Sequence, residues 1–215
     1  LGISDGEIFV TSEPGKSISI GDLFIHEIPL KGSEVIGTAS FVIPTVPADA
    51  QTGQSERIVA YYGHFAHAVE VAVNVLTGAV KVVRITAATD MGKPVNPELA
   101  QGQMEGGFLM GIGTSIYEQI ILKNGVVANP NFIDYKIPTT LEMPPNDNVK
   151  AMIHPVPHPE GPFGAKGLGE GVIVPIAPAI ANAVYNAVGV RIRDLPISAE
   201  KLLKQLKKNG QKEKD

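Results

Sequence analysis

Residues 66–87 read AHAVEVAVNVLTGAVKVVRITA, and this stretch decides the predicted fold. Valine recurs at every second position in its first half, the pair Thr77 and Gly78 interrupts the pattern, and a second apolar run follows. A period of two is typical of a strand with one buried face, and two such runs joined by a glycine-containing turn indicate a hairpin. The stretch therefore predicts an antiparallel β-hairpin with strands at residues 66–75 and 80–87.

The segment after this hairpin predicts a long helix over residues 97–122. Residues 90–94 (DMGKP) end the second strand, and Pro97 falls in the first helical turn, where its missing N–H costs nothing. Each glycine inside a helix costs about 1 kcal/mol relative to alanine, so repeated glycines suggest close approach by another helix or by a ligand. Both explanations stay open for the four interior glycines, which are Gly102, Gly106, Gly107 and Gly111.

Shorter signals predict the rest of the secondary structure, and together they indicate an α+β fold. Strands are expected at residues 7–11, 35–43 and 149–154, a helical turn at 21–28, a loop at 44–55, a hairpin turn at 123–126, and helices at 177–188, before Gly189, and after Ser198. Residues 137–148 and 155–171 are rich in proline or glycine and are expected to be irregular. Because strand pairs and helices are interspersed without a regular βαβ rhythm, we predict mixed sheets with β-hairpins and packed helices.

The composition excludes several classes of function. The chain has 215 residues, 44% of them hydrophobic, which is enough for a sizeable core, and its net charge of -4 gives no global signature of nucleic-acid binding. It has no cysteine, which excludes disulfides, a cysteine nucleophile and thiolate-held iron–sulfur clusters within this chain. No signal peptide and no membrane span are visible, so a cytoplasmic location is expected.

The most informative segment for function is residues 161–171, which read GPFGAKGLGEG. Its five glycines let the backbone approach a ligand closely, and the helix expected after it favours an ionised Glu170 through its partial positive charge. An ionised carboxylate on a rigid turn is a candidate general base. A phosphate-binding loop is disfavoured, because the final glycine spacing and a Lys-Ser or Lys-Thr pair are absent. From these residues alone, a structural turn and a catalytic loop are equally well supported.

Several further motifs occur in order along the chain. They are DMGKPVNP at 90–97, GQMEGG at 102–107, GIG at 111–113 followed by Glu118, NFIDYKIP at 131–138, the glycine loop with Glu170, the alanine-rich helix at 179–187, and DLP at 194–196. Together they resemble the xanthine dehydrogenase and aldehyde oxidase family of molybdenum hydroxylases, in the C-terminal part of its molybdopterin-binding subunit. The resemblance is continuous from about Val59 to Leu203, whereas residues 1–58 fit it only loosely.

The resemblance implies an enzyme that hydroxylates an aldehyde or an aromatic N-heterocycle, with water as the oxygen source and Glu170 as the general base. It implies a molybdopterin cofactor with molybdenum, in the cytosine dinucleotide form. Residues 56–205 would be the C-terminal part of the molybdopterin-binding domain, between the end of an adjoining subdomain with its linker (1–55) and a charged tail (206–215). The cofactor-binding residues that it implies are Gln103, Ala165, Lys166, Gly167, Leu168 and Gly169. Two alternatives to cofactor binding stay open. Gln103 would only pack against its neighbours on the helix, and Lys166 would be only a solvated side chain.

Partner chains are a further implication of the resemblance. The family's upstream half is not part of this chain, and a cysteine-free chain cannot hold iron–sulfur clusters. We therefore expect another molybdenum-domain chain, an iron–sulfur subunit and a flavin subunit with FAD, besides a small-molecule substrate. Leu1 in place of an initiating methionine indicates a fragment or a processed product. Two alternatives stay open, a non-catalytic scaffold piece of such a complex and an aromatic thioester reductase of the same family.

The histidines show no metal-site pattern. His64 and His67 flank the start of the first hairpin strand, where they would point to opposite faces and make a poor chelate. His154 and His158 lie in a proline-rich stretch and are expected in a substrate loop or at the surface. Asp90 is expected to serve the turn that follows it.

Overall fold

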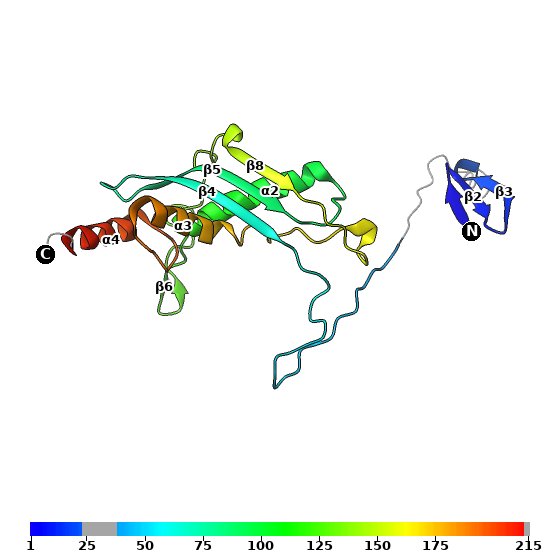
Figure 1. The fold of residues 1–215 in the computed structure, drawn as a ribbon, viewed down its shortest axis with the longest axis horizontal. Helices are drawn as coiled ribbons and strands as arrows, with labels where there is room; N and C mark the ends of the chain where they lie inside the picture. The colour runs from blue at the N-terminus through cyan, green and yellow to red at the C-terminus, as the bar shows by residue number, and fades with distance from the viewer. Residues whose placement is uncertain (23–37, 213–215) are drawn as a thin grey trace. The chain divides into compact units, whose positions relative to one another are not determined.

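The computed structural model describes residues 1–22 and 38–212 of the chain, which divides into two units, Leu1–Val42 and Ile43–Asp215 (Figure 1). The first unit contains a three-stranded antiparallel sheet, and its strands in order are β1 (Gly2–Ser4), β2 (Glu7–Val10) and β3 (Glu13–Ser19). Strand β2 confirms the strand predicted at residues 7–11.

The other two predictions for the N-terminal segment lie largely outside the described residues. This is true of most of the helical turn expected at 21–28 and of the start of the strand expected at 35–43. Residues 38–43 are described and are irregular, so the strand prediction is wrong there. Val42 is 83% exposed, and no strand in the described part of the chain lies beside this apolar run to pair its backbone groups.

The predicted hairpin is confirmed as strands β4 (Phe65–Val73) and β5 (Val80–Thr89), with Val69 opposite Ile85. Strand β8 (Val149–Ile153) pairs in parallel with β5, which gives a three-stranded sheet in the order β4-β5-β8. The pairing of β4 with β5 contains a bulge, which shifts the alternation of buried side chains along β5. Val82 and Ile85 are therefore both buried although they are three residues apart. The hairpin thus turns one continuous apolar face toward the helices.

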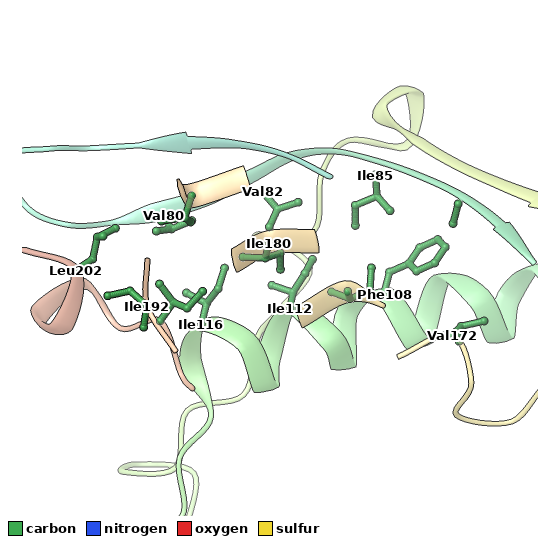
Figure 2. Close-up of a cluster of buried hydrophobic side chains, with 14 of the residues drawn as sticks. Val80, Val82, Ile85, Phe108, Ile112, Ile116, Val172, Ile180, Ile192 and Leu202 are labelled. Carbon is green, nitrogen blue, oxygen red and sulfur yellow. The ribbon is translucent and has the colours of Figure 1, made fainter. Parts of the chain in front are cut away.

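Helices α2 (Pro97–Ile112) and α3 (Ile176–Val188) pack on that face of the sheet. Figure 2 shows Phe108 and Ile112 of α2 and Ile180 of α3 pointing toward Val82 and Ile85 of β5. Burying an aliphatic or aromatic side chain of this size contributes about 1.5–3 kcal/mol. One sheet covered by two helices therefore forms the core of the second unit, as an α+β fold.

Helix α2 ends earlier than residue 122, where the sequence placed its end. A π-helical turn (Gly113–Tyr117) follows it, closed by the N–H of Glu118, which donates to the Gly113 carbonyl at 2.8 Å. The Asn129 side chain then accepts from the N–H of Ile121 at 2.8 Å and donates to the Gln119 carbonyl at 2.7 Å. These bonds redirect the chain into an extended form before the helix can continue.

A small hairpin follows, made of β6 (Leu122–Lys123) and β7 (Val126–Val127). Its turn residues Asn124 and Gly125 have φ angles of 51° and 79°, the conformation that Asn-Gly favours in two-residue hairpin turns. The predicted turn at residues 123–126 is confirmed.

The four glycines inside α2 divide into two pairs with different surroundings. A Cβ atom at Gly107 would lie 2.2 Å from a methyl group of Val172, and one at Gly111 would lie 2.6 Å from Cβ of Ile176. At Gly102 and Gly106 nothing lies within 4 Å, and both line an open groove of about 830 Å³. Close helix packing therefore explains the second pair, and the first pair faces open space.

This division predicts opposite effects for two alanine substitutions. Gly111→Ala is expected to lower the free energy of unfolding by about 1–3 kcal/mol, because the new methyl group meets the backbone-proximal Cβ of Ile176. Gly102→Ala has no such neighbour and is expected to raise stability by up to about 1 kcal/mol through better helix propensity. Denaturant unfolding followed by circular dichroism measures both changes. Equal effects of the two substitutions would contradict the packing described here.

The C-terminal helices end and begin as predicted. Gly189 closes α3 in the left-handed conformation with φ of 68°, and the Ser198 hydroxyl accepts from the N–H of Lys201 at 3.3 Å at the start of α4 (Ala199–Lys212). Leu202 is fully buried on the inner side of α4. Most of the tail expected from residue 206 is part of this helix. In the described ranges, no helix combines the length and the apolar character that crossing a membrane requires.

Candidate functional site

The glycine loop is attached to the turn that ends strand β5. The N–H of Lys166 donates to the Met91 carbonyl at 2.9 Å, and the N–H of Lys93 donates to the Gly164 carbonyl at 2.8 Å. Gly92 lies between these bonds with φ of 65°, and a Cβ there would lie 2.3 Å from the Gly164 carbonyl oxygen. Only glycine fits such a close approach of two backbones, so the loop lies directly against the 90–94 turn.

A buried ion pair joins the same two segments. The Lys166 Nζ lies 2.5 Å from Oδ2 of Asp90, and the two side chains are 9% and 5% exposed. Burial pushes the pKa of Asp90 upward, but hydrogen bonds from Lys166, the Gly92 N–H and His64 outweigh burial and hold this pKa below its ordinary value. Asp90 is therefore an ionised partner for Lys166 and not only a turn residue.

The Lys166 side chain is not merely solvated, because it is buried and its ammonium group donates to Asp90. That Lys166 binds the cofactor stays a prediction. Its partner lies 76 residues away in the sequence, so no local pattern could have indicated the pair.

Gln103 extends from α2 to the loop and contacts it directly. Its Nε2 donates to the Gly169 carbonyl at 2.9 Å, so the structure brings these two predicted site residues together. Leu168 lies between Lys166 and Gly169 in the loop, and its side chain packs against the core. A hollow of about 200 Å³ separates this part of the loop from the first turn of α2. Its lining includes Ala165, Lys166 and Leu168 from the loop, with Ala100 from the helix and Asn96, the residue that caps it.

Of the five backbone N–H groups of residues 166–170 in the loop, two have partners within the chain. The N–H of Lys166 donates to Met91, and that of Gly167 donates to the Tyr61 hydroxyl at 2.6 Å. The next three N–H groups, those of Leu168, Gly169 and Glu170, have no acceptor among the residues that the structure describes. A row of successive free N–H groups is suited to binding an anion.

Glu170 lies in the turn that precedes α3, and its side chain is exposed. Within the described ranges no lysine, arginine or histidine forms an ion pair with it. Helix α3 begins only at Ile176, so the partial charge of the helix, which acts over its first turn, lies further from the carboxylate than the sequence suggested.

His67, His158 and His154 lie in different surroundings. His67 is half-buried, with its ring edge-on to Phe108 at a centroid distance of 5.4 Å, and burial lowers its pKa. His158 is buried instead of lying at the surface, and its Nε2 is 3.3 Å from the Ala60 carbonyl oxygen. His154 is exposed. Across the described part of the chain, no three His, Cys, Asp or Glu side chains gather to hold a metal ion.

Comparison with known proteins identifies the class to which this fold and loop belong. The family model of the molybdopterin cofactor-binding domain matches residues 1–144. The xanthine dehydrogenase molybdenum-binding subunit of Escherichia coli O157:H7 is 40% identical over 139 residues, which cover 64% of this chain and 18% of that protein. A probable hypoxanthine oxidase of Escherichia coli (strain K12) is 33% identical over 195 residues, covering 87% and 19%. The solved aldehyde oxidoreductase from Desulfovibrio gigas is 33% identical with a TM-score of 0.68, covering 75% and 17%.

The chain belongs to the molybdopterin cofactor-binding domain family, found in the molybdenum-binding subunits of xanthine dehydrogenases and aldehyde oxidoreductases. It spans 18% and 19% of the length of the two sequence relatives. The family match begins at residue 1, so the prediction that residues 1–58 fit only loosely is wrong. The family match ends before the glycine loop. The match to the probable hypoxanthine oxidase covers 87% of the chain, so the unmatched residues at either end are too few for the loop to lie outside the matched region.

Proposed function

We propose that this chain forms one wall of the molybdopterin site in a multisubunit molybdenum hydroxylase, with Glu170 as the general base. The observation that carries this proposal is the row of free N–H groups at Leu168, Gly169 and Glu170. The loop is fixed from both sides, by Met91 and by Gln103, and still presents these donors. Such a rigid row of donors favours a phosphate-bearing ligand over solvent.

The surroundings of this row fit a phosphate-bearing pterin. The Gln103 amide oxygen stays available as an acceptor beside the row, since the hydrogen bond to Gly169 uses its nitrogen. The hollow beside the loop adjoins the first turn of α2, where a helix carries partial positive charge. Ala165, Gly167, Leu168 and Gly169 would contribute backbone contacts. The Lys166 side chain would support the loop through its ion pair with Asp90 and would not bind the phosphate directly.

Two features of Glu170 support its proposed role as the general base. Its carboxylate is exposed and carries no ion pair within the described chain, so a small molecule can reach it. When bound, the molybdenum cofactor would accept the two electrons that leave the substrate carbon. The task of Glu170 is to orient the water whose oxygen enters the product and to accept its proton at a carboxylate oxygen.

The finer assignments follow from the resemblance and from the names of the relatives. Because those names refer to xanthine and to aldehydes, the proposed substrate is an aldehyde or an aromatic N-heterocycle. The cofactor would be the cytosine dinucleotide form. The complex would be cytoplasmic, with one chain carrying the rest of the molybdenum-binding subunit, an iron–sulfur subunit and a flavin subunit. Residues 56–205 would be this chain's share of the cofactor domain, with 1–55 from an adjoining subdomain and 206–215 as a charged extension.

Isotope labelling tests the reaction class. The complex, purified natively through a tag on this chain, is given an aromatic aldehyde or a purine in H₂¹⁸O with a dye as electron acceptor. Mass spectrometry of the product is expected to show one oxygen atom from the labelled water. Product oxygen that comes instead from dissolved O₂ would contradict the proposal.

A further inference from the structure

Residues 57–61, which we call the strap, lie against the segment that leads into the glycine loop. Arg57 forms an ion pair with Glu160, with a second contact of 3.2 Å between its Nη1 and Oε1 of that residue. The hydrogen bond from Arg57 holds the pKa of Glu160 below its ordinary value. His158 Nε2 lies 3.3 Å from the Ala60 carbonyl oxygen. The strap is therefore fixed to residues 158–160 before it reaches the loop itself.

Tyr61, the last residue of the strap, contacts the loop through its hydroxyl group. Its oxygen accepts the N–H of Gly167 at 2.6 Å, and its ring stands edge-on to His158 with centroids 5.3 Å apart. The ring contact fixes where the hydroxyl lies, because a tyrosine side chain has only two main torsions. Gly167 has no side chain that could anchor it. The hydrogen bond from its N–H to Tyr61 therefore holds its backbone in position.

The bond to Tyr61 lies next to the part of the loop that the proposed function uses. Gly167 directly precedes the three free N–H groups, and the Gln103 contact at Gly169 holds the loop from the other side. Because the Tyr61 hydroxyl accepts the N–H of Gly167, the row of free N–H groups begins at Leu168. We propose that Tyr61 is a positioning residue, whose hydroxyl sets the backbone of Gly167 and thereby aligns the N–H row and Glu170. This inference rests on the proposed function for its catalytic consequence, but not for the contact itself.

Hydrogen exchange tests the contact in the natively purified complex. Tyr61→Phe keeps the ring and removes the acceptor, so exchange in a peptide covering residues 161–171 is expected to rise roughly two- to tenfold, the effect of losing one hydrogen bond. Tyr62→Phe is the matched control, since Tyr62 is 71% exposed and makes no side-chain hydrogen bond in the described part of the chain. Unchanged exchange in Tyr61→Phe would overturn the inference.

A second pair of variants tests the same contact by rescue. A Cβ atom at Gly167 would lie 2.6 Å from the Tyr61 hydroxyl oxygen but 3.8 Å from the ring carbon that carries it. Gly167→Ala alone is therefore expected to disturb the loop and raise its exchange. Added to Tyr61→Phe, the same substitution is expected to cause no further rise, because the clashing oxygen is gone. An equal increase in both backgrounds would show that Tyr61 does not hold Gly167.

Kinetics separates the contact from its catalytic consequence. If Glu170 needs this alignment, Tyr61→Phe lowers kcat by about tenfold or more, with KM and molybdenum content unchanged, because misplaced groups reduce turnover even when binding persists. Wild-type kcat in a Tyr61→Phe complex whose loop exchanges faster would overturn the positioning role. A wild-type complex without turnover would defeat the proposed function instead, and the exchange experiments would still decide the contact.

Discussion

Replacing Glu170 by glutamine is expected to lower kcat roughly a hundredfold to ten-thousandfold, the range over which general bases contribute. Glutamine keeps the size of the side chain and its hydrogen-bonding reach but cannot accept the proton of the attacking water. Because the Glu170 side chain is exposed and has no internal ion pair in the described chain, the substitution leaves the fold unchanged. Turnover is measured in the natively purified complex, with molybdenum content determined on the same sample.

The control for this substitution is Glu70→Gln. Glu70 is an exposed carboxylate on β4 with a loose contact to Arg84 of 3.6 Å, so its loss is expected to leave kcat unchanged. A Glu170→Gln complex that retains its molybdenum and turns over at the wild-type rate would refute the assignment of the base. Parallel losses of metal and turnover would instead show that Glu170 helps to hold the cofactor.

The second large effect is expected at the buried pair of Asp90 and Lys166. Asp90→Asn leaves the Lys166 ammonium group buried without a charge partner, which typically costs about 3–5 kcal/mol in the free energy of unfolding. Asp194→Asn is the matched control, since Asp194 pairs with Lys201 at 2.9 Å but is 79% exposed. Its loss is expected to cost no more than about 1 kcal/mol. Chemical denaturation of both variants measures the difference, and equal losses would refute a special role for the buried pair.

The pH dependence of stability gives an independent check on the same pair. The folded-state pKa of Asp90 lies below its ordinary value of 3.8, so its contribution to stability is present above that pH. This contribution is lost as the pH falls through the lowered pKa, because the unfolded chain then binds the proton more readily. Wild-type protein is therefore expected to lose more stability than Asp90→Asn does as the pH falls below 3.8.

Local patterns were sufficient to predict the elements that hold the site. The alternating valines predicted β4 and β5, and the alanine-rich run with Gly189 predicted α3, because each pattern follows from which face of a single element is buried. The end of α2 was missed because the Asn129 side chain, from the far side of the next hairpin, redirects the chain after the π-helical turn. That contact is tertiary, and nothing within the helix signals it.

The candidate site was predictable only in part, for the same physical reason. Glycine density and one carboxylate marked the loop, whereas the hydrogen bond from Gln103 to Gly169 was not predicted. That Gln103 binds the cofactor stays a prediction. Tyr61 and the role of Asp90 were not foreseen, since their partners are 106 and 76 residues away in the sequence. Contacts of this range depend on how the strap, the strand end and the loop come together, which no short pattern encodes.

Molybdenum content shows whether this chain forms part of a molybdopterin site. The complex is purified natively through this chain, its subunits are identified, and metal is quantified by mass spectrometry against the amount of chain. We predict molybdenum in near-equal proportion to the chain, released together with a phosphate-bearing pterin on denaturation. A complex that contains all its partner subunits but neither molybdenum nor pterin would contradict the proposed function and favour a scaffolding role.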